Sequence, residues 1–464
     1  MSRKNTVNRM IIFIIACAIG WCMRTTLPVQ AAPRVQQPSN GDHFVIVIDP
    51  GHGGENEGTI ENGFLEKSMT MLTAQAMYEE LCHYDDLEVY LTRTTDVDLP
   101  LKERAEYAAG VKADFLFSIH YNASVDHDLF GSEVWISSFP PYNAYGYQFG
   151  YTQMLTMRQM GLYLRGIKTK LNDRGTDYYG IIRESTELGL PAVIIEHCHV
   201  DEERDYPFCD SEEELVAFGK ADALSVAKYL GLSSQELGVD YSSYAEELPE
   251  VNKGARVPST IKDETEPEVC ELELLDTDYD NGILKLKLSA ADYDSPLIYY
   301  QSSYDGGQTF GPLQPWPDCD VLENTYTDTF TFFMEIPSGV QPMVMVRVYN
   351  LFDVFTDSNF IDIPYSFKYG EELQPQKTVE EKAGEPAEEA KSNLPGTTTF
   401  MPQSPEQPVK EEGVRFSNFI KLCLIIAAIL LVTVMLSQMI YYNRRRRKRR
   451  QRRKAEGASK NHPR

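Results

Sequence analysis

The sequence predicts an α/β domain with a mostly parallel sheet and helices on both faces, followed by an all-β, immunoglobulin-like sandwich and a single transmembrane helix. Three observations predict this order. In the first half, strand-like apolar runs alternate with segments of helical periodicity, as in a parallel sheet covered on both faces. In the second half, short strands are separated by turn residues, as in β-sandwiches. Near the C-terminus, an apolar run approaches the roughly 20 residues that cross a bilayer.

The charge of the chain is acidic but unevenly distributed. Its 464 residues carry a formal net charge of −25, although residues 444–450 are all arginine or lysine. The remainder is therefore more acidic than the total suggests, which argues against nucleic acid as a partner. A chain of 464 residues also exceeds one ordinary domain, so two folded units joined by linkers are expected.

The C-terminal region has the pattern of a membrane span. Residues 422–440 are almost wholly apolar, Tyr441 and Tyr442 follow at interfacial depth, and the basic run comes next. Lysine and arginine flanks mark the cytoplasmic side, so the tail is predicted to be cytoplasmic and the body extracellular. Clustered arginines beside an apolar span are more typical of a membrane flank than of a nucleic-acid-binding or nuclear-import segment.

The N-terminal region resembles a secretory signal peptide. Arg3, Lys4 and Arg9 precede an apolar run, and small residues near position 31 offer a cleavage site. Because Arg24 lies between the apolar run and that site, an uncleaved signal anchor is the alternative. Both interpretations export the body of the protein, and the predicted C-terminal span would hold it at the cell membrane.

These patterns divide the chain into seven segments. They are a signal peptide (1–31), an α/β domain (44–231), an acidic linker (232–268), a β-sandwich (269–366), a stalk (367–415), a transmembrane helix (418–442) and a cytoplasmic tail (443–464). The stalk is predicted to be disordered because it is rich in Pro, Glu, Lys and Thr and poor in large apolar residues.

Hydrophobic periodicity places the individual elements. In the first domain, strands are expected at 45–48, 87–92, 115–119, 132–137 and 192–195, and helices at about 65–76, 101–109, 147–171 and 211–231. The last helix has a capping box, with Ser211 at its N-cap and Glu214 three residues on, and Gly231 ends it. In the second domain, strands are expected at 272–274, 283–288, 329–334 and 344–348, with a tight hairpin at 303–310.

Export makes disulfide bonds possible, and five cysteines lie outside the two apolar terminal segments. The candidate pairs are Cys198 with Cys209, near the end of the first domain, and Cys270 with Cys319, in the second. Connectivity cannot be deduced from sequence, so both pairings stay open, and the odd count leaves at least one thiol unpaired in a monomer. No C-x-x-C spacing occurs, so a four-cysteine metal site is not expected.

Four side chains of the first domain suit metal or proton chemistry and follow or end predicted strands. His52 lies in the turn after the first strand, Glu66 opens the next helix, and His120 and Glu196 each end an apolar run. The carboxyl ends of parallel strands share one edge of a sheet, where such folds place their sites. Two histidines and one glutamate, with one position left for water, form a catalytic rather than a structural zinc pattern. The residues therefore predict a zinc hydrolase.

At this point the sequence resembles a known family. The motifs DPGHGG, FLEKSMT, SIHYNAS and PAVIIE occur in the order found in zinc-dependent N-acetylmuramoyl-L-alanine amidases of the cell wall. The resemblance covers residues 44–230 and includes Arg93 and Arg104, whereas the rest of the chain shows none. It implies a hydrolase that cuts the amide between the lactyl group of muramic acid and the first alanine of the peptidoglycan stem peptide. One Zn²⁺ per domain is implied as cofactor and peptidoglycan as partner.

The resemblance also implies roles for individual residues. His52, Glu66 and His120 would be the zinc ligands, and Glu196 the catalytic carboxylate that moves a proton. Asn122 and Arg183 are candidate substrate-binding residues. The structural alternatives are a helix-capping His52, a Glu66 that interacts only with its helix dipole, and a Glu196 paired with a base such as Arg183.

The chain departs from the family directly after Glu196. A glycine, an aromatic residue, a small residue and an asparagine are usual there, whereas this chain has the sequence His197-Cys198-His199-Val200-Asp201. The two histidines could bind a second metal, but they are more typical of ordinary loop residues. The departure motivates an alternative function, a non-catalytic wall-binding or adhesion protein with the amidase fold. A zinc peptidase is less consistent with the sequence, because no HExxH helix occurs.

Overall fold

The computed structural model describes residues 38, 41 and 43–369, all of which belong to one compact unit. The predicted signal peptide, transmembrane helix and basic tail, and nearly all of the stalk, lie outside the described residues. Within the described part of the chain, every helix is too short or too polar to cross a membrane.

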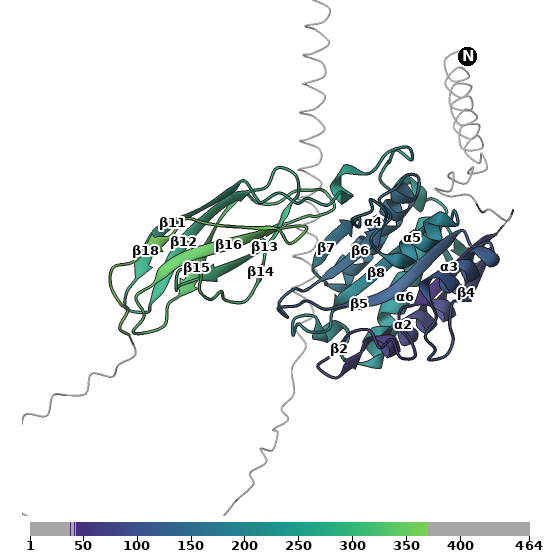
Figure 1. The fold of residues 1–464 in the computed structure, drawn as a ribbon, viewed down its shortest axis with the longest axis horizontal. Coiled ribbons are helices and arrows are strands. Elements are labelled where there is room, and N and C mark those ends of the chain that lie inside the picture. Colours follow the sequence, from purple (N-terminus) through teal and green to yellow (C-terminus); the bar gives the residue numbers. More distant parts are fainter. Residues whose placement is uncertain (1–37, 39–40, 42, 370–464) are drawn as a thin grey trace, which may run out of the picture. The chain divides into compact units, whose positions relative to one another are not determined.

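The first domain is built on a six-stranded sheet of order β4-β1-β5-β8-β6-β7 (Figure 1). Its strands are β1 (Phe44–Pro50), β4 (Leu87–Leu91), β5 (Phe115–Asn122), β6 (Ser132–Ile136), β7 (Leu164–Lys168) and β8 (Ala192–His199). Neighbours among β4, β1, β5 and β8 pair in parallel, whereas β6 is antiparallel to β8 and parallel to β7. The predicted mostly parallel sheet is confirmed.

Helices cover both faces of this sheet (Figure 1). On one face lie α2 (Glu66–Leu81), α4 (Tyr142–Met160) and α6 (Glu212–Leu230), and on the other α3 (Leu101–Gly110) and α5 (Gly180–Glu187). Alternate residues of β1 explain the two layers: Ile46 and Ile48 pack toward α2, whereas Val47 packs with the α3 and α5 layer. A strand buried on both faces has the continuous apolar run seen in the sequence.

The stretch from Tyr147 to Glu187 differs from the sequence-based expectation. The helix expected over 147–171 ends at Met160, because Gly161 takes the left-handed conformation with φ 98° and caps it. The chain then forms β7, and the short helix α5 also escaped prediction. In contrast, α6 begins and ends as predicted: the Ser211 side chain accepts from the Glu214 N–H, and Gly231 at φ 65° is the C-cap.

The segment 232–268 is ordered and packs against the first domain. It contains β9 (Ser233–Ser234), β10 (Val239–Asp240) and the short 3-10 helices η2 (Tyr244–Glu246) and η3 (Pro258–Thr260). The Val257 N–H donates to Asn143 Oδ1 over 2.7 Å, and the Thr169 N–H donates to the Thr260 carbonyl over 2.9 Å. Such contacts are invisible to local periodicity, which is why this stretch looks like a plain linker in the sequence.

The second domain consists of antiparallel sheets. One contains β11 (Val269–Asp278), β12 (Ile283–Ala291) and β15 (Thr329–Glu335), and the other contains β13 (Leu297–Ser303), β14 (Gln314–Pro315), β16 (Met343–Asn350) and β17 (Phe355–Asp357), with β18 (Ile361–Asp362) paired to β16. Leucines of β12 and valines of β16 bury alternate side chains in a common core. The predicted all-β unit is confirmed, and its immunoglobulin-like topology stays a prediction.

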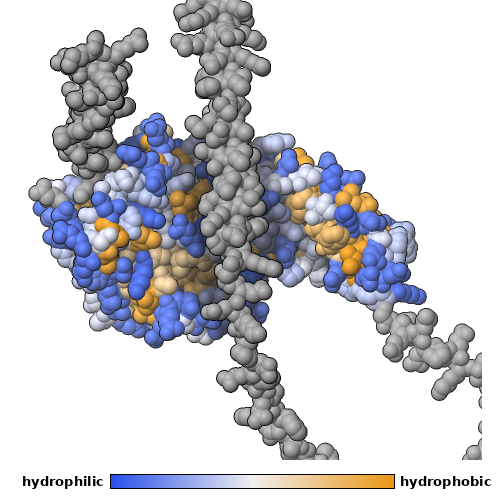
Figure 2. Space-filling view, turned by 180° about the vertical axis from the view of Figure 1, so that it is seen from behind, coloured by the Kyte–Doolittle hydropathy of each residue, from blue (hydrophilic) through white to orange (hydrophobic). Residues whose placement is uncertain are grey.

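The surface is mainly hydrophilic, with separate hydrophobic patches on the face shown in Figure 2. The most exposed aromatic side chains of the second domain are Tyr293, Phe333 and Phe360. Scattered exposed apolar residues are normal on a soluble surface, so these three do not define a binding site.

The structure contains neither candidate disulfide, since Cys198, Cys209, Cys270 and Cys319 are all free thiols. Cys198 and Cys209 are buried side by side as hydrogen-bonded thiols, and burial together with the Cys209 thiol raises the pKa of Cys198 well above its usual value. Cys270 directs its Sγ toward the Val346 carbonyl instead of toward Cys319. The predicted proximity of Cys198 and Cys209 is therefore present, although both are free thiols.

Candidate metal centre

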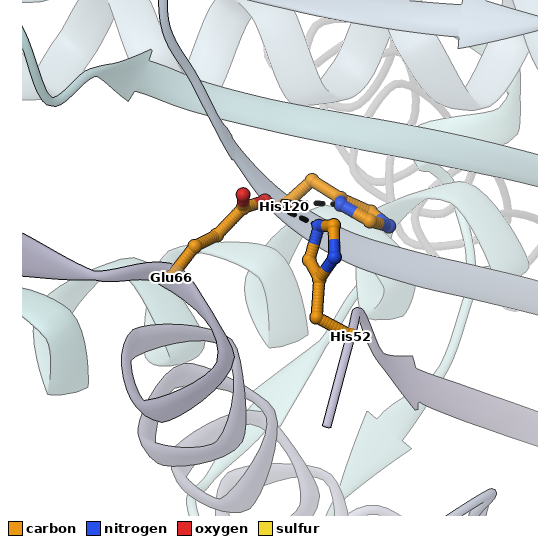
Figure 3. A group of neighbouring side chains, drawn as sticks. All are labelled: His52, Glu66 and His120. Atoms are coloured by element: carbon orange, nitrogen blue, oxygen red, sulfur yellow. Dashed lines mark hydrogen bonds and ion pairs between the residues drawn. The ribbon is translucent and has the colours of Figure 1, made fainter. Parts of the chain in front are cut away.

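Three side chains from separate elements converge at the carboxyl edge of the sheet. His52 lies in the turn after β1, Glu66 is the first residue of α2, and His120 lies near the end of β5. Figure 3 shows the two imidazoles directed at the same carboxylate oxygen. Glu66 Oε1 lies 3.0 Å from His52 Nε2 and 3.1 Å from His120 Nδ1. The predicted ligand set is therefore brought together.

The geometry fits a divalent zinc ion. The three ligand atoms lie within 4.8 Å of one another. Ligands placed about 2.0–2.1 Å from a tetrahedral ion are separated by about 3.3 Å. The distances from Glu66 Oε1 to the two histidine nitrogens, 3.0 and 3.1 Å, are close to this value. His52 Nδ1 lies 2.9 Å from Asn56 Oδ1, a contact that would keep a proton on Nδ1 and leave Nε2 as the ligating atom when a metal is bound. Two imidazoles and a carboxylate leave one corner of the tetrahedron open.

Electrostatics favour the ionised form of the glutamate. Burial alone would raise the pKa of Glu66, but the hydrogen bonds from His120 and His52 outweigh burial and lower this pKa. Burial alone would lower the pKa of His52, and the Glu66 carboxylate raises it. Glu66 also accepts from the Thr59 N–H over 2.8 Å and from the Tyr121 N–H over 3.1 Å, which orients the carboxylate.

The turn that presents His52 is held in a strained conformation by two buried arginines. His52 has φ 61°, a region that residues other than glycine rarely adopt. Arg104 donates to the carbonyls of His52 and Pro50 over 2.6 and 2.7 Å, and Arg93 donates to the Gly51 carbonyl over 2.8 Å. Both arginines belong to the family motifs found in the sequence. Their hydrogen bonds fix the backbone that carries a metal ligand.

Glu196 lies beside the metal cluster on the same face of the sheet. It is the register partner of His120 on β5 and of Glu133 on β6. Its Oε2 atom is buried and has no hydrogen-bond partner among the described residues. Burial, together with the charges of Glu66 and Glu133, raises the pKa of Glu196 well above its usual value. A carboxyl of this kind suits proton transfer at neutral pH.

The two candidate substrate residues contact the protein itself. Asn122 donates from Nδ2 to Glu133 Oε1 over 2.9 Å. Arg183 donates to the carbonyls of Asp177 and Tyr178, and its ion-pair partner within the described chain is the neighbouring Glu184 at 3.8 Å. Arg183 therefore braces a loop and does not pair with Glu196. A substrate contact by either residue stays a prediction.

Sequence reasoning missed Glu133. This residue is buried, and four side chains donate to its carboxylate: Asn122, Trp135, Arg165 and Lys168. Burial alone would raise its pKa, but the positive charges of Lys168 and Arg165 lower it far below the usual range. The sequence offers a single weak signal, a charged residue inside the apolar strand run 132–136.

The residues after Glu196 do not build a second metal site among the described residues. His197 has hydrogen-bond acceptors at both ring nitrogens, the His120 carbonyl and the Asp222 carboxylate. His199 is buried, its Nδ1 donates to the Gly131 carbonyl, and its Nε2 has no partner in the part of the chain that the structure describes. The side chains of His197, Cys198 and His199, which depart from the family pattern, are thus buried and do not displace Glu196.

A cavity of about 310 Å³ opens beside the two histidines. Its walls include His52, His120, Leu101, Tyr179 and Ile194. It combines an apolar, aromatic wall with the metal-binding edge, as expected of a substrate pocket.

Comparison with known proteins matches the first domain to a family. Residues 46–228 match the family described as N-acetylmuramoyl-L-alanine amidase. The amidase CwlM of Bacillus licheniformis is 31% identical over 192 residues, which cover 40% of this chain and 69% of that protein. LytC of Bacillus subtilis is 37% identical over 106 residues, 23% of this chain and 21% of LytC. The catalytic domain of CwlV from Bacillus (Paenibacillus) polymyxa var. colistinus is 29% identical, with 40% of this chain and 98% of that chain covered and a TM-score of 0.35.

The fold and the His₂Glu cluster define a zinc-hydrolase type of α/β domain. The chain belongs to the N-acetylmuramoyl-L-alanine amidase family.

Proposed function

We propose that this protein is a membrane-anchored, extracellular N-acetylmuramoyl-L-alanine amidase. It hydrolyses the amide between the lactyl group and L-alanine in peptidoglycan and thereby remodels the cell wall. The observation that carries the proposal is the convergence of His52, Glu66 and His120 on one point, with Glu196 beside them. The family of the chain supplies the substrate.

Different residues of the site would bind the metal, transfer the proton and exclude water. His52, Glu66 and His120 would hold one Zn²⁺, which when bound supplies Lewis acidity and makes water a nucleophile near neutral pH. Glu196 accepts a proton from the attacking water and delivers it to the departing amine of alanine. Tyr179 and Leu101 form an apolar wall that excludes bulk water from the scissile bond.

The activity is tested by digesting purified peptidoglycan with the full-length protein and zinc. Release of free stem peptides is expected. Glu196→Gln should reduce the rate at least about 100-fold while zinc remains bound, because this residue moves protons and does not hold the metal. Glu187→Gln, an exposed carboxylate at the end of α5, serves as the control. Failure of the wild-type protein to release peptides from any peptidoglycan type would contradict the proposal.

The anchoring part of the proposal rests on sequence. The apolar run within 418–442 and the basic residues that follow it would fix the chain in the membrane with the tail inside. The stalk, 367–415, would let the amidase reach the wall.

A non-catalytic wall-binding protein is the second candidate, motivated by the unusual residues after Glu196. The buried positions of His197 and Cys198 weaken that motive, because neither side chain enters the cavity. Wall binding with one zinc and no released peptide would nevertheless favour this candidate over the enzyme.

A further inference from the structure

The second domain is linked to the amidase site through a cluster of charges that is buried except for the partly exposed Asp353. Glu133 lies opposite Glu196 on the antiparallel strands β6 and β8, so both side chains project from the same face, with Cβ atoms about 5 Å apart. The Ser132 hydroxyl also donates to the Glu196 carbonyl over 3.0 Å. A displacement of Glu133 would therefore change the electrostatic environment of Glu196.

Glu133 in turn holds the wall of the cavity. Its Oε1 accepts from Trp135 Nε1 over 3.0 Å, and the Trp135 ring packs on Tyr179 with 4.9 Å between centroids. Tyr179 lines the cavity beside His52 and His120. All four hydrogen bonds to Glu133 come from side chains that are themselves packed, so its carboxylate has one defined position.

Arg165 connects Glu133 to the second domain. Its Nε donates to Glu133 over 3.0 Å, its Nη2 donates to both oxygens of Asp353 over 3.1 and 2.8 Å, and its Nη1 donates to the Tyr299 hydroxyl over 3.2 Å. Asp353 and Tyr299 belong to the second domain. Three of the four hydrogen bonds of this buried guanidinium are therefore made across the domain boundary.

The charges balance only when both domains contribute. Arg165 and Lys168 carry two positive charges, and Glu133 and Asp353 carry two negative charges. Without Asp353 the buried group would keep an uncompensated positive charge, which is costly in a poorly solvated environment. A domain that served only as a spacer would have no reason to place a carboxylate here.

The backbone of the first domain is shaped to receive the second. A bulge in the β6–β7 pairing puts Gly166 at φ 84°, and a Cβ there would lie 3.0 Å from Leu351 Cδ1. The bulge directs Arg165 toward Glu133, and the absent side chain of Gly166 leaves room for the β16–β17 hairpin. Packing and charge thus support the same contact.

We propose that the β16–β17 hairpin of the second domain supports the amidase active site from outside, because Asp353, acting through Arg165, positions Glu133 beside Glu196. Asp353 and Glu133 are positioning residues, because neither touches the metal ligands or the cavity. The kinetic test of this inference, given below, rests on the proposed amidase function. The tryptophan fluorescence test does not.

The test compares Asp353→Asn with Arg158→Gln in the full-length protein. Arg158 also forms a two-bond ion pair across the domain boundary, with Asp320 over 2.8 and 3.2 Å, but it lies on the surface and does not contact Glu133. Asparagine suits the φ of 64° at position 353, so the backbone is retained. Arg165→Lys is the second variant: it keeps the charge, but a single ammonium cannot bridge Glu133 and Asp353.

Asp353→Asn and Arg165→Lys should each lower kcat about 10-fold or more, with KM changed less than about twofold and zinc still at one equivalent. Arg158→Gln should match the wild type. In the Glu133→Gln background, Asp353→Asn should cause little further loss, because both substitutions break the same link. The proposal is overturned if Asp353→Asn and Arg165→Lys behave like Arg158→Gln, or if the losses from Asp353→Asn and Glu133→Gln multiply.

A second readout does not depend on activity. The chain has three tryptophans, so Trp21→Phe and Trp316→Phe leave Trp135 as the one indole reporter. Its fluorescence emission should shift in Asp353→Asn and stay unchanged in Arg158→Gln. If the wild-type protein released no peptides, the proposed function would fail, and this emission comparison would still decide whether Asp353 positions the Glu133 group. Equal emission in both variants would overturn the link.

Discussion

Gly58 illustrates how closely single residues define the metal centre. It has φ 71°, and a Cβ at this position would lie 2.5 Å from Glu66 Oε2 and 2.8 Å from His52 Cδ2. Both ligands therefore occupy space that any other residue would need. Gly58 lies outside the DPGHGG motif, so the motif alone does not reveal this requirement for glycine.

Gly58→Ala should weaken zinc binding about 10- to 100-fold by displacing two ligands. Gly63→Ala is the matched control, since Gly63 has φ 87° and no atom within 4 Å of its Cβ position. Both variants carry the same kind of backbone strain, and only the first disturbs the cluster. Zinc titration of the two variants should separate them, and equal affinities would contradict the assigned role of Gly58.

His199 should make folding stability depend on pH. Burial, assisted by the charge of Arg165, lowers its pKa to about 3, against about 6.5 when unfolded. Because the folded-state pKa is depressed, the stabilisation is complete above pH 6.5 and is lost as the pH falls toward 3, by about 5 kcal/mol in total. Asp205 acts in the opposite sense: burial raises its pKa to about 6, so its contribution is complete below about pH 4 and is lost as the pH rises through 6.

The His199 contribution is isolated by comparison with His199→Asn, which can still donate to the Gly131 carbonyl. Urea unfolding between pH 3 and pH 7 should show a shallower acid loss of stability in the variant. Identical pH profiles for the two proteins would show that His199 does not carry this dependence.

At the scale of elements, helix α3 secures the turn after β1 through Arg104. Its guanidinium forms an ion pair with Asp49 at 2.9 Å, and both side chains are almost completely buried. Arg104→Met would leave the Asp49 carboxylate buried without this partner, which should cost about 3–5 kcal/mol of folding free energy. Zinc binding should fall as well, because the His52 carbonyl loses its donor.

Lys102→Met is the control on the same helix. Lys102 pairs with Glu106 at 3.7 Å on the exposed surface, so its loss should change stability by less than about 0.5 kcal/mol. Chemical denaturation measures both variants. Similar losses of stability in the two would contradict the role assigned to Arg104.

The elements also show what could be predicted from the sequence. The runs ending at His120 and Glu196 predicted buried parallel strands, because a strand covered on both faces is continuously apolar. That inference also placed all four site residues on one edge of the sheet. The strand at Leu164–Lys168 escaped prediction, since it contains Arg165, Gly166 and Lys168, whose burial depends on partners far away in the chain.

At the scale of the whole molecule, the sequence predicted the order of the domains but not the contacts between them. The segment 232–268 packs on the first domain, and Tyr299 of the second domain lies in the same hydrophobic cluster as Phe130 of the first. Interfaces between domains have no local periodic signal, so they emerge only from the folded chain.

Membrane anchoring is a testable expectation at this scale. An epitope placed after Arg450 should resist protease added outside intact cells, whereas the amidase domain should be cleaved from the surface, because basic flanks stay on the cytoplasmic side. Permeabilised cells should lose the epitope. Digestion of the epitope in intact cells would contradict the predicted orientation.

The central claim is that two imidazoles and one carboxylate bind a single zinc ion, and metal analysis of the purified full-length protein tests it most directly. One zinc per chain is predicted for the wild type and for Glu196→Gln, with little or none in His52→Ala or His120→Ala. Loss of zinc in Glu196→Gln, or full zinc content in both histidine variants, would contradict the assignment of the site.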